Sequence, residues 1–153
     1  MEAMLREIVR EFGVDSKQAR ELQDNYNIKP TEELYVVTQD QITTASWGMI
    51  APWSKSSSEA LKSQSKAINA RSETVHEKPT FKNAFRRSRC LVPATGYYEW
   101  ATELGEYKPR QPIYVSRDDG QLLAFAGIYD RWKSPEGESR NSVSIITREA
   151  VGD

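Results

Sequence analysis

Two reactive side chains lie within ten residues of each other in the middle of the chain. Cys90 is the only cysteine, and it directly precedes the segment LVPATGYYEW, in which Glu99 is a lone carboxylate among three large aromatic residues. A thiol can act as a nucleophile and a carboxylate can transfer protons. Because burial of an unpaired carboxylate costs several kcal/mol or shifts its pKa, Glu99 either bonds within the core or takes part in a reaction.

Cys90 is the weaker of these two candidates. A catalytic thiol needs a nearby base or a cationic field, and His76, the only histidine, lies in a polar stretch with no visible coupling to it. Strand alternation places Cys90 with Val92 and away from Arg89. Since free cysteine is among the most buried residue types, the sequence predicts a core cysteine.

Alternation in a strand also assigns the faces of the other polar residues. It places Glu99 beside the phenol of Tyr97, which by pattern alone indicates a surface acid on a half-exposed strand. Asn69 and Arg71 share a face in INARSET, with Glu73 in phase, a pattern more typical of a salt-bridged strand face than of a site.

Trp53 follows Pro52 and opens a serine-rich segment. Its indole could stack on a nucleobase or seal the core under a loop, and the pattern leaves both readings open.

Charge and composition narrow the classes of partner. The chain has 21 Lys and Arg against 22 Asp and Glu, but residues 66–89 carry seven Lys and Arg against two acids, so this segment could face phosphate. One cysteine and one histidine exclude an internal disulfide and the usual zinc spacings, and we expect no metal, no other cofactor and a reduced, cytoplasmic setting. No apolar run approaches the roughly 18 residues of a membrane span, so we expect no membrane segment.

The elements that must position these residues follow from periodicity. Apolar residues at helical spacing predict a helix over residues 4–12 that stops at Gly13, and Asp15 with Gln18 predicts a shorter helix that ends before Pro30. ELYVV and QITTASWGMI read as a strand hairpin across Thr38 to Asp40. Residues 54–66, with six serines, predict a mobile surface loop that could include one helical turn.

The second half of the chain predicts further strands around one helix. The helix is TFKNAFRR, and the strands are AINARSETV, RCLVPATGYYEWA with a break at Pro93 and Gly96, PIYVSR, LLAFAGIYDRW and SVSIIT. Together the elements predict an α+β fold: residues 1–153 as a single domain with a mainly antiparallel, curled or barrel-like β-sheet core flanked by helices.

Four segments, taken in order and spacing, carry a resemblance. YNIKPT, WGMIAPW, INARSET and RCLVPATGYYEW resemble the SOS-response-associated peptidase (SRAP) family. The resemblance implies a sensor of abasic sites in single-stranded DNA that serves the DNA damage (SOS) response, in a family named for an autoproteolytic peptidase activity. It also implies an N-terminal cysteine, exposed by removal of the initiator methionine, that forms a thiazolidine crosslink with the ring-opened sugar.

The resemblance assigns a role to each matching position. Glu99 would be a catalytic proton shuttle, and Asn69 would orient the reacting centre. The DNA-binding residues it implies are Arg71 on a phosphate, Ser72 and Thr74 beside it, Pro30 and Trp53 in DNA-facing segments, and Arg86 in the basic surface of residues 82–89.

Two departures from the family pattern concern the ends of the chain. It opens with MEAML, already inside the first predicted helix, where the family has Met-Cys-Gly-Arg, and it stops before the family's His-x-Arg-Met-Pro motif. We therefore expect a domain truncated at both ends that keeps the DNA groove and Glu99 but forms no crosslink. Two alternatives remain: a non-catalytic module that binds single-stranded nucleic acid, and a cysteine hydrolase that uses Cys90.

Overall fold

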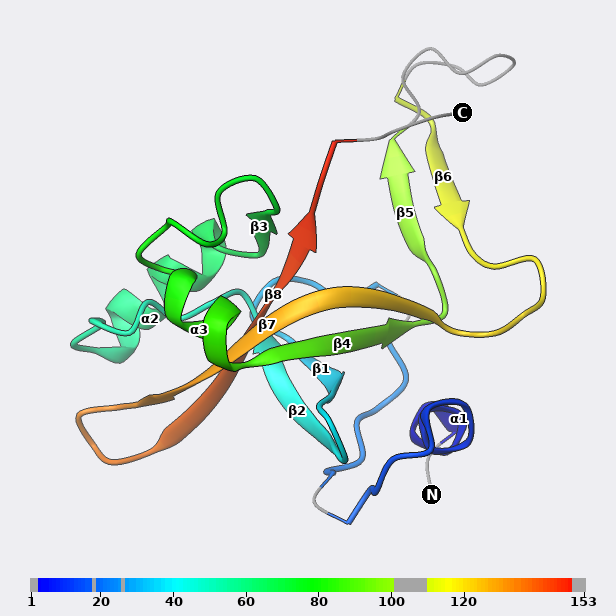
Figure 1. Ribbon diagram of the computed structural model, residues 1–153, viewed down its shortest axis with the longest axis horizontal. Coiled ribbons are helices and arrows are strands. Elements are labelled where there is room, and N and C mark those ends of the chain that lie inside the picture. Colours follow the sequence, from blue (N-terminus) through cyan, green and yellow to red (C-terminus); the bar gives the residue numbers. More distant parts are fainter. Residues whose placement is uncertain (1–2, 18, 26, 101–109, 150–153) are drawn as a thin grey trace.

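The structure is a computed structural model, and it describes residues 3–17, 19–25, 27–100 and 110–149. Within these ranges the chain forms three helices and eight strands (Figure 1). In chain order they are α1 Ala3–Phe12, β1 Glu33–Val37, β2 Ile42–Trp47, α2 Ser57–Lys66, β3 Asn69–Arg71, α3 Lys82–Arg87, β4 Arg89–Ala94, β5 Tyr97–Trp100, β6 Pro112–Val115, β7 Leu123–Lys133 and β8 Ser139–Thr147. The predicted α+β class is confirmed.

Six of the strands form one curled sheet that closes on itself. Their order is β2-β1-β4-β7-β8-β3, and β2 pairs in addition with β8, so that five strands make a barrel to which β3 is attached. The closing seam is a parallel pair of only two positions, Ser46 with Ser142 and Trp47 with Val143. The β1–β2, β1–β4, β4–β7 and β7–β8 pairs are antiparallel, which confirms the predicted curled, mainly antiparallel sheet.

The core lies on both faces of β1, because four of its five residues are buried. Val36 packs with Val92 and Val143 in a cluster shared by strands around the barrel. Tyr35 points to the opposite face and packs with Leu5 of α1, as expected from the alternation of side chains along a strand. The amphipathic α1 therefore covers the outside of the barrel, and Gly13, at φ 63°, ends it as predicted.

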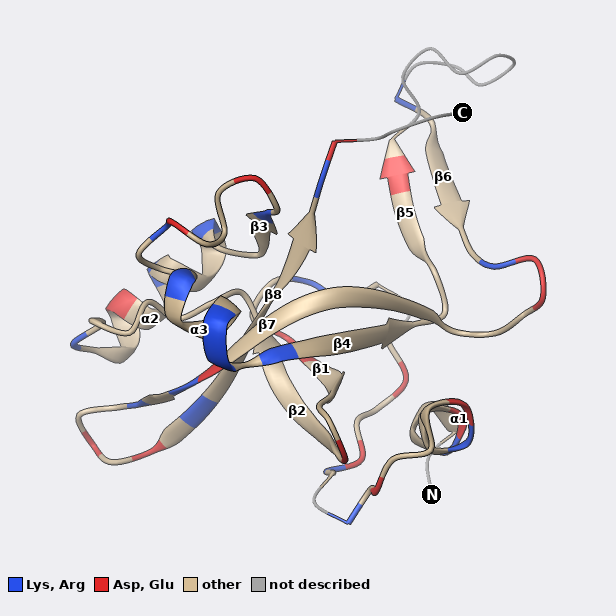
Figure 2. Ribbon diagram, viewed as in Figure 1, with Lys and Arg blue, Asp and Glu red and all other residues tan. Residues whose placement is uncertain are grey.

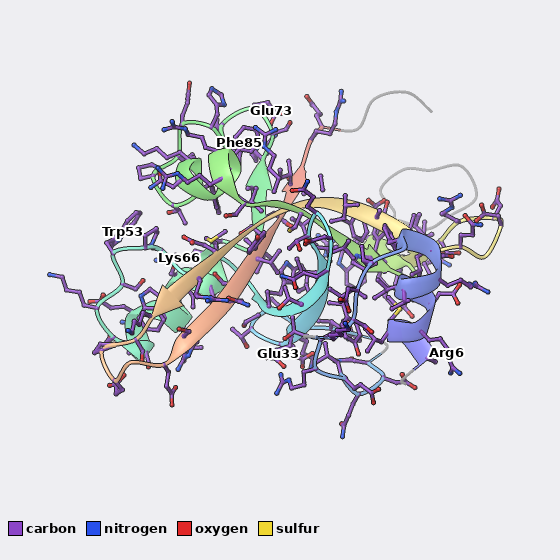
Figure 3. All side chains as sticks on the ribbon, turned by 60° about the horizontal axis from the view of Figure 1, so that its bottom comes forward. Arg6, Glu33, Trp53, Lys66, Glu73 and Phe85 are labelled. Carbon is purple, nitrogen blue, oxygen red and sulfur yellow. The ribbon has the colours of Figure 1, made fainter. Side chains whose placement is uncertain are left out.

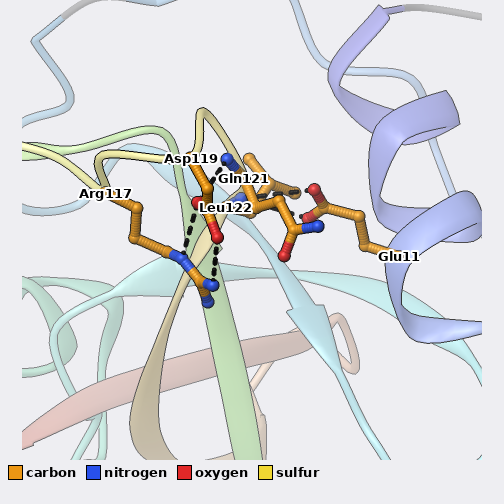
Figure 4. Close-up of polar contacts among 5 residues, drawn as sticks. All are labelled: Glu11, Arg117, Asp119, Gln121 and Leu122. Carbon is orange, nitrogen blue, oxygen red and sulfur yellow. Dashed lines mark hydrogen bonds and ion pairs between the residues drawn. The ribbon is translucent and has the colours of Figure 1, made fainter.

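One polar contact holds the C-terminal half of α1 to the turn before β7. The Glu11 carboxylate accepts a hydrogen bond from the Leu122 backbone N–H at 3.1 Å (Figure 4). The turn itself is tightened by Asp119, which accepts from the Arg117 guanidinium at 2.6 Å and from the Gln121 backbone N–H at 3.0 Å. None of the helices in the described ranges is long and apolar enough to cross a membrane.

The prediction of a mobile loop over residues 54–66 is wrong, because this segment contains the ten-residue helix α2. Ser56 is its N-cap and accepts a hydrogen bond from the Glu59 N–H at 3.1 Å. Ala60 and Gln64 are buried on its inner face. The helix was missed because its buried face consists of a small residue and an amide rather than large apolar residues.

The short helix predicted to start at Asp15 is absent from the described residues up to Pro30, and Gln18 lies outside them. Asp15 instead forms an isolated β-bridge with Gln41, and its carboxylate accepts from the Lys17 N–H. Aspartate often caps helices, but Asp15 thus forms a local turn and a strand contact in place of a helix.

The strand predicted across residues 89–101 is interrupted at one of its two expected points. Pro93 lies within β4, paired with Ala124, and the chain leaves the barrel at Thr95 and Gly96. After the break, β5 pairs with β6 in a separate two-stranded sheet that projects from the barrel (Figure 1). At Gly96 a β-carbon would lie 2.4 Å from the Tyr114 ring, so only glycine permits this close approach.

Candidate functional site

A cleft of about 580 Å³ lies between α2, β3 and the segment that leads into α3. We call it the Trp53 cleft. The residues that line it are Ala51, Trp53, Lys62, Ser63, Lys66, Ala67, Asn69, Arg71, Thr74, Lys78, Thr80 and Phe81. It therefore collects side chains from segments that lie as far as 30 residues apart.

Strand β3 presents two of the predicted site residues to this cleft. Asn69 and Arg71 are exposed on either side of the buried Ala70, which confirms the predicted alternation. Ala70 anchors the strand in the core with Met49 and Ile128. Because β3 pairs with β8 along one edge, the positions of both polar side chains are set by the barrel.

The indole of Trp53 is 57% exposed at the mouth of the cleft. A reverse turn holds it there, in which the Ser54 N–H donates to the Ala51 carbonyl and the Ser63 hydroxyl of α2 accepts from the Ala51 N–H. Trp53 and Lys66 lie on the same side of the molecule (Figure 3). The alternative in which Trp53 seals the core is wrong, and a free aromatic face is available for stacking.

The cleft is strongly cationic. Among its described lining residues are Lys62, Lys66, Arg71 and Lys78, with no Asp or Glu. Further Lys and Arg residues lie on α3 and at the start of β4 (Figure 2). The basic stretch of the sequence thus contributes Lys66, Arg71 and Lys78 to the cleft, where phosphate groups would be attracted.

Arg71 has one acidic neighbour outside the lining. Its Nε lies 3.6 Å from the Glu73 carboxylate. A backbone hydrogen bond, and then the charge of Arg71, lower the pKa of Glu73, so this carboxylate stays ionised. Because both side chains are largely exposed, the pair is weak, and Arg71 can exchange its partner for a phosphate.

The predicted site residues divide into two groups. Asn69, Arg71, Thr74 and Trp53 all line the Trp53 cleft. The residues outside its lining are Pro30 in the turn before β1, Ser72 in the turn after β3, Arg86 on the exposed face of α3, and Glu99 on β5. The Ser72 N–H donates to the Thr147 carbonyl at 2.8 Å, so its backbone serves the β3–β8 pairing.

Glu99 is exposed on the projecting sheet, on the same face as Tyr97. Desolvation raises the pKa of Tyr97, and the charge and hydrogen bonding of Glu99 raise it further, so the two side chains are in contact and the phenol stays protonated. The predicted pairing of carboxylate and phenol is confirmed. In Figure 1 β5 and β3 lie apart, with the end of β8 between them.

Sequence reasoning missed Lys62, because the helix that carries it was read as a loop. The signal was present: Ser56 and Glu59 have the S-x-x-E spacing of a capping box. Lys62 and Lys66 follow one helical turn apart, which places both on one face of α2.

Comparison with known proteins settles the family. The sequence profile of the family described as SOS response associated peptidase (SRAP) matches residues 1–153. The chain belongs to the SRAP family.

Relatives of this SRAP chain are known from bacteria and animals. It is 33% identical over 146 residues to the abasic site processing protein YoqW of Bacillus subtilis (strain 168), covering 92% of the chain and 62% of YoqW. It is 35% identical over 126 residues to the abasic site processing protein HMCES of Rattus norvegicus, covering 66% of the chain and 35% of HMCES. The chain thus spans less than two thirds of either relative.

A solved structure has the same fold. A crystal structure of a protein from Bordetella bronchiseptica superposes on the SRAP chain with a TM-score of 0.80 and 26% identity, covering 97% of this chain and 70% of the other. The barrel and its attached helices therefore recur in that protein.

Cys90 of the SRAP chain is a core residue, as predicted. It is 8% exposed, and an added β-carbon on Gly127 would lie 3.0 Å from its sulfur. Burial raises the pKa of the thiol to about 12, so almost no thiolate forms at neutral pH. These properties argue against the cysteine hydrolase alternative.

We expect the Cys90 thiol to resist modification in the native state. At pH 8 its reaction with a disulfide reagent should be at least about 100-fold slower than in urea-unfolded protein, because the thiolate is nearly absent from the fold. The unfolded thiol ionises near pH 8.5, so the folding free energy from this group is intact below that pH and is lost as pH rises toward about 12. Absorbance of the released thiolate and urea unfolding of wild type and Cys90→Ala at pH 7 and 10 test this, and fast native modification would contradict it.

The described part of the chain holds no cluster of three or more His, Cys, Asp or Glu side chains that could bind a metal ion. His76 lies on an exposed turn, where its Nε2 is 3.3 Å from the Glu77 carboxylate. Neither residue lines the Trp53 cleft.

Proposed function

We propose that this protein binds single-stranded DNA in the Trp53 cleft and processes abasic sites there. The observation that carries the proposal is the combination, in one cleft, of an exposed indole with four Lys and Arg side chains and no acid among the described lining residues. Cations neutralise backbone phosphates without regard to sequence, and an aromatic face stacks on any base or fills the gap where a base is missing. The names of the relatives YoqW and HMCES, abasic site processing proteins, support the choice of lesion.

For a chain that begins with the family's N-terminal cysteine, the chemistry we propose is the crosslink that the family resemblance implies. The α-amino group of an N-terminal cysteine adds to the aldehyde of the ring-opened sugar, and loss of water gives an imine. The thiol then adds to the imine carbon and closes a thiazolidine, with its proton passing to the nitrogen. Asn69 would orient the sugar from the cleft, Arg71 would hold a neighbouring phosphate, and Glu99 would move the protons.

The place of Glu99 adds a requirement to this proposal. Because it lies on β5 outside the lining of the cleft, the β5–β6 sheet must approach the cleft when DNA is bound. The sheet joins the barrel at Thr95 and Gly96 on one side and through residues 116–122 on the other, so this approach requires backbone changes in both connections. A reduced, cytoplasmic setting and a role in the response to DNA damage belong to the same proposal.

An adduct that survives denaturation tests the chemistry. We expect the chain preceded by a Met-Cys-Gly-Arg start to form such an adduct with single-stranded DNA that carries an abasic site, but not with its tetrahydrofuran analogue, which has no aldehyde. Glu99→Gln should slow adduct formation about 100-fold by removing the proton-transfer group, while leaving affinity for intact DNA unchanged. No adduct in this protein, together with no effect of Glu99→Gln, would refute the proposal.

The second candidate function is a non-catalytic module for single-stranded nucleic acid. It is favoured by the position of Glu99 outside the cleft, since binding alone needs only the cationic groove and Trp53. Binding that weakens with salt and with Arg71→Ala, in a cysteine-led protein that forms no adduct, would select this function.

A further inference from the structure

A second cleft, of about 710 Å³, lies on the other side of α2. It opens where β2 and β8 separate, because these strands pair at only two positions before they diverge. We call it the Arg140 cleft, after one of its lining residues, which include Thr44, Gln64, Arg131, Ser139, Arg140 and Asn141. The Asn141 amide spans the opening and donates to the Thr44 carbonyl at 3.3 Å.

The two arginines of this cleft have weak partners within the protein. The Arg131 Nε donates to the Asn141 side-chain oxygen at 3.4 Å, and an Arg140 terminal nitrogen donates to the Ser57 hydroxyl at 3.3 Å. Arg140 also lies 5.7 Å above the ring of Trp132, which orients its guanidinium. Neither arginine forms an ion pair with an acid of the described chain, so most of their N–H donors are available to an anion.

The one acid among the described lining residues of this cleft already has a basic partner. Glu33 lines the Arg140 cleft, but it is ion-paired with Arg20. The remaining lining side chains include hydroxyls and amides, which donate to phosphate or sugar oxygens. The cleft therefore has the side chains of a site for a phosphate-bearing ligand.

Helix α2 is a wall of both clefts. Lys62 and Lys66 line the Trp53 cleft, and Leu61 and Gln64 line the Arg140 cleft. The exposed face between them carries the two lysines and the half-exposed side chain of Leu61. A cationic path with an apolar contact point thus leads over the helix from one cleft to the other.

We propose that the Arg140 cleft binds the backbone of the same nucleic-acid strand, after that strand has crossed α2 from the Trp53 cleft. This inference rests on the proposed function. A helix with its side chains is about 10–12 Å across, and a stacked strand rises about 3.4 Å per nucleotide, so a stacked strand reaches the second site about four nucleotides beyond the first.

The length of the DNA strand distinguishes the two sites experimentally. Fluorescence anisotropy would measure the affinity of the protein for single-stranded DNA of about five and about 15 nucleotides at several salt concentrations. For Arg131→Gln/Arg140→Gln we expect at least about fivefold weaker binding of the long strand, a salt slope smaller by about 1.4 for two lost phosphate contacts, and unchanged binding of the short strand. Equal affinity of this variant and wild type for the long strand would overturn the inference.

Two opposite substitutions of Ser139 test the Arg140 cleft without changing either arginine. It is exposed at the start of β8 in the Arg140 cleft, so Ser139→Lys should tighten and Ser139→Glu should weaken binding of the long strand, with no change for the short one. This pair decides the question if the double arginine variant is unstable. Arg6→Gln, on the far side of the molecule from Trp53 and Lys66 (Figure 3), controls for net charge.

The outcomes separate this inference from the proposed function. If Arg71→Ala weakens binding of both strands but the Arg140 cleft variants change neither, the second site is refuted and the Trp53 cleft stands. If Arg71→Ala changes neither strand, the proposed function fails. Binding of an acidic peptide in place of the long strand, lost in Arg131→Gln/Arg140→Gln, would assign the cleft to a protein partner and overturn the inference.

Discussion

Replacing Gly48 by alanine is expected to lower the free energy of unfolding by about 3 kcal/mol or more. Gly48 has a φ of 114°, where side chains are disfavoured, and a β-carbon there would lie 2.4 Å from the Gln64 carbonyl oxygen. The clash is with the backbone of α2, which cannot move aside without leaving the barrel. Urea unfolding followed by circular dichroism measures the loss.

The hydrogen bonds of Gly48 explain why its substitution should weaken both the barrel seam and the attachment of α2. Its N–H donates to the Val143 carbonyl at 2.8 Å, next to the barrel seam, and its carbonyl accepts from the Gln64 amide at 3.0 Å. Gly120→Ala is the matched control, because Gly120 also has positive φ, at 74°, but no atom of the described residues lies within 4 Å of its added carbon. For Gly120→Ala we expect the free energy of unfolding to fall by about 1 kcal/mol. Similar losses in the two variants would contradict the packing argument.

Replacing Trp53 by alanine is expected to weaken binding of single-stranded DNA by about 5-fold to 150-fold. Stacking of one base on an aromatic side chain contributes about 1–3 kcal/mol, and the exposed indole is positioned for it at the mouth of the cleft. Stability should change little, since the side chain is outside the core. Anisotropy titrations of labelled DNA measure the affinity.

Two variants test whether the Trp53 effect is specific to its place. Trp53→Phe keeps an aromatic face and should recover most of the affinity. Leu91→Ala removes an apolar side chain that is 38% exposed on β4, outside the lining of both clefts and outside the β5–β6 sheet. An equal loss of affinity in Trp53→Ala and Leu91→Ala would show that the cleft is not where the DNA strand binds.

The sequence predicted the elements with large, regularly spaced apolar residues. The faces of Cys90, Asn69 and Glu99 followed from strand alternation and are as predicted. Barrel closure rests on Ser46 meeting Ser142, almost a hundred residues later, and no local pattern encodes such a pair. The helix α2 escaped prediction because it is held by its N-cap and a buried amide rather than by an apolar stripe.

The sequence predicted only part of the site, because the rest depends on contacts between residues that are distant in the chain. Motif resemblance named Asn69, Arg71 and Trp53, which the fold brings into one cleft, and it also named Glu99, which the fold places on a separate hairpin. The bend at Gly96 that separates them depends on the packing of Tyr114, a contact between residues 18 positions apart. The second cleft could not be foreseen, because it exists only where two paired strands diverge.

The shortness of the barrel seam has a dynamic consequence. β2 and β8 pair at two positions and β1 and β4 at one, whereas β7 and β8 pair at seven, so local opening should begin at these short pairings, and the amide hydrogens of the seam should exchange with solvent before those of β7. Through Gln64 and Ser63, α2 is bonded to the chain that follows β2, so it would move with that side of the opening. A fluctuation at the seam would then change the widths of both clefts together. A ligand bound in both clefts would therefore stabilise the closed form of the barrel.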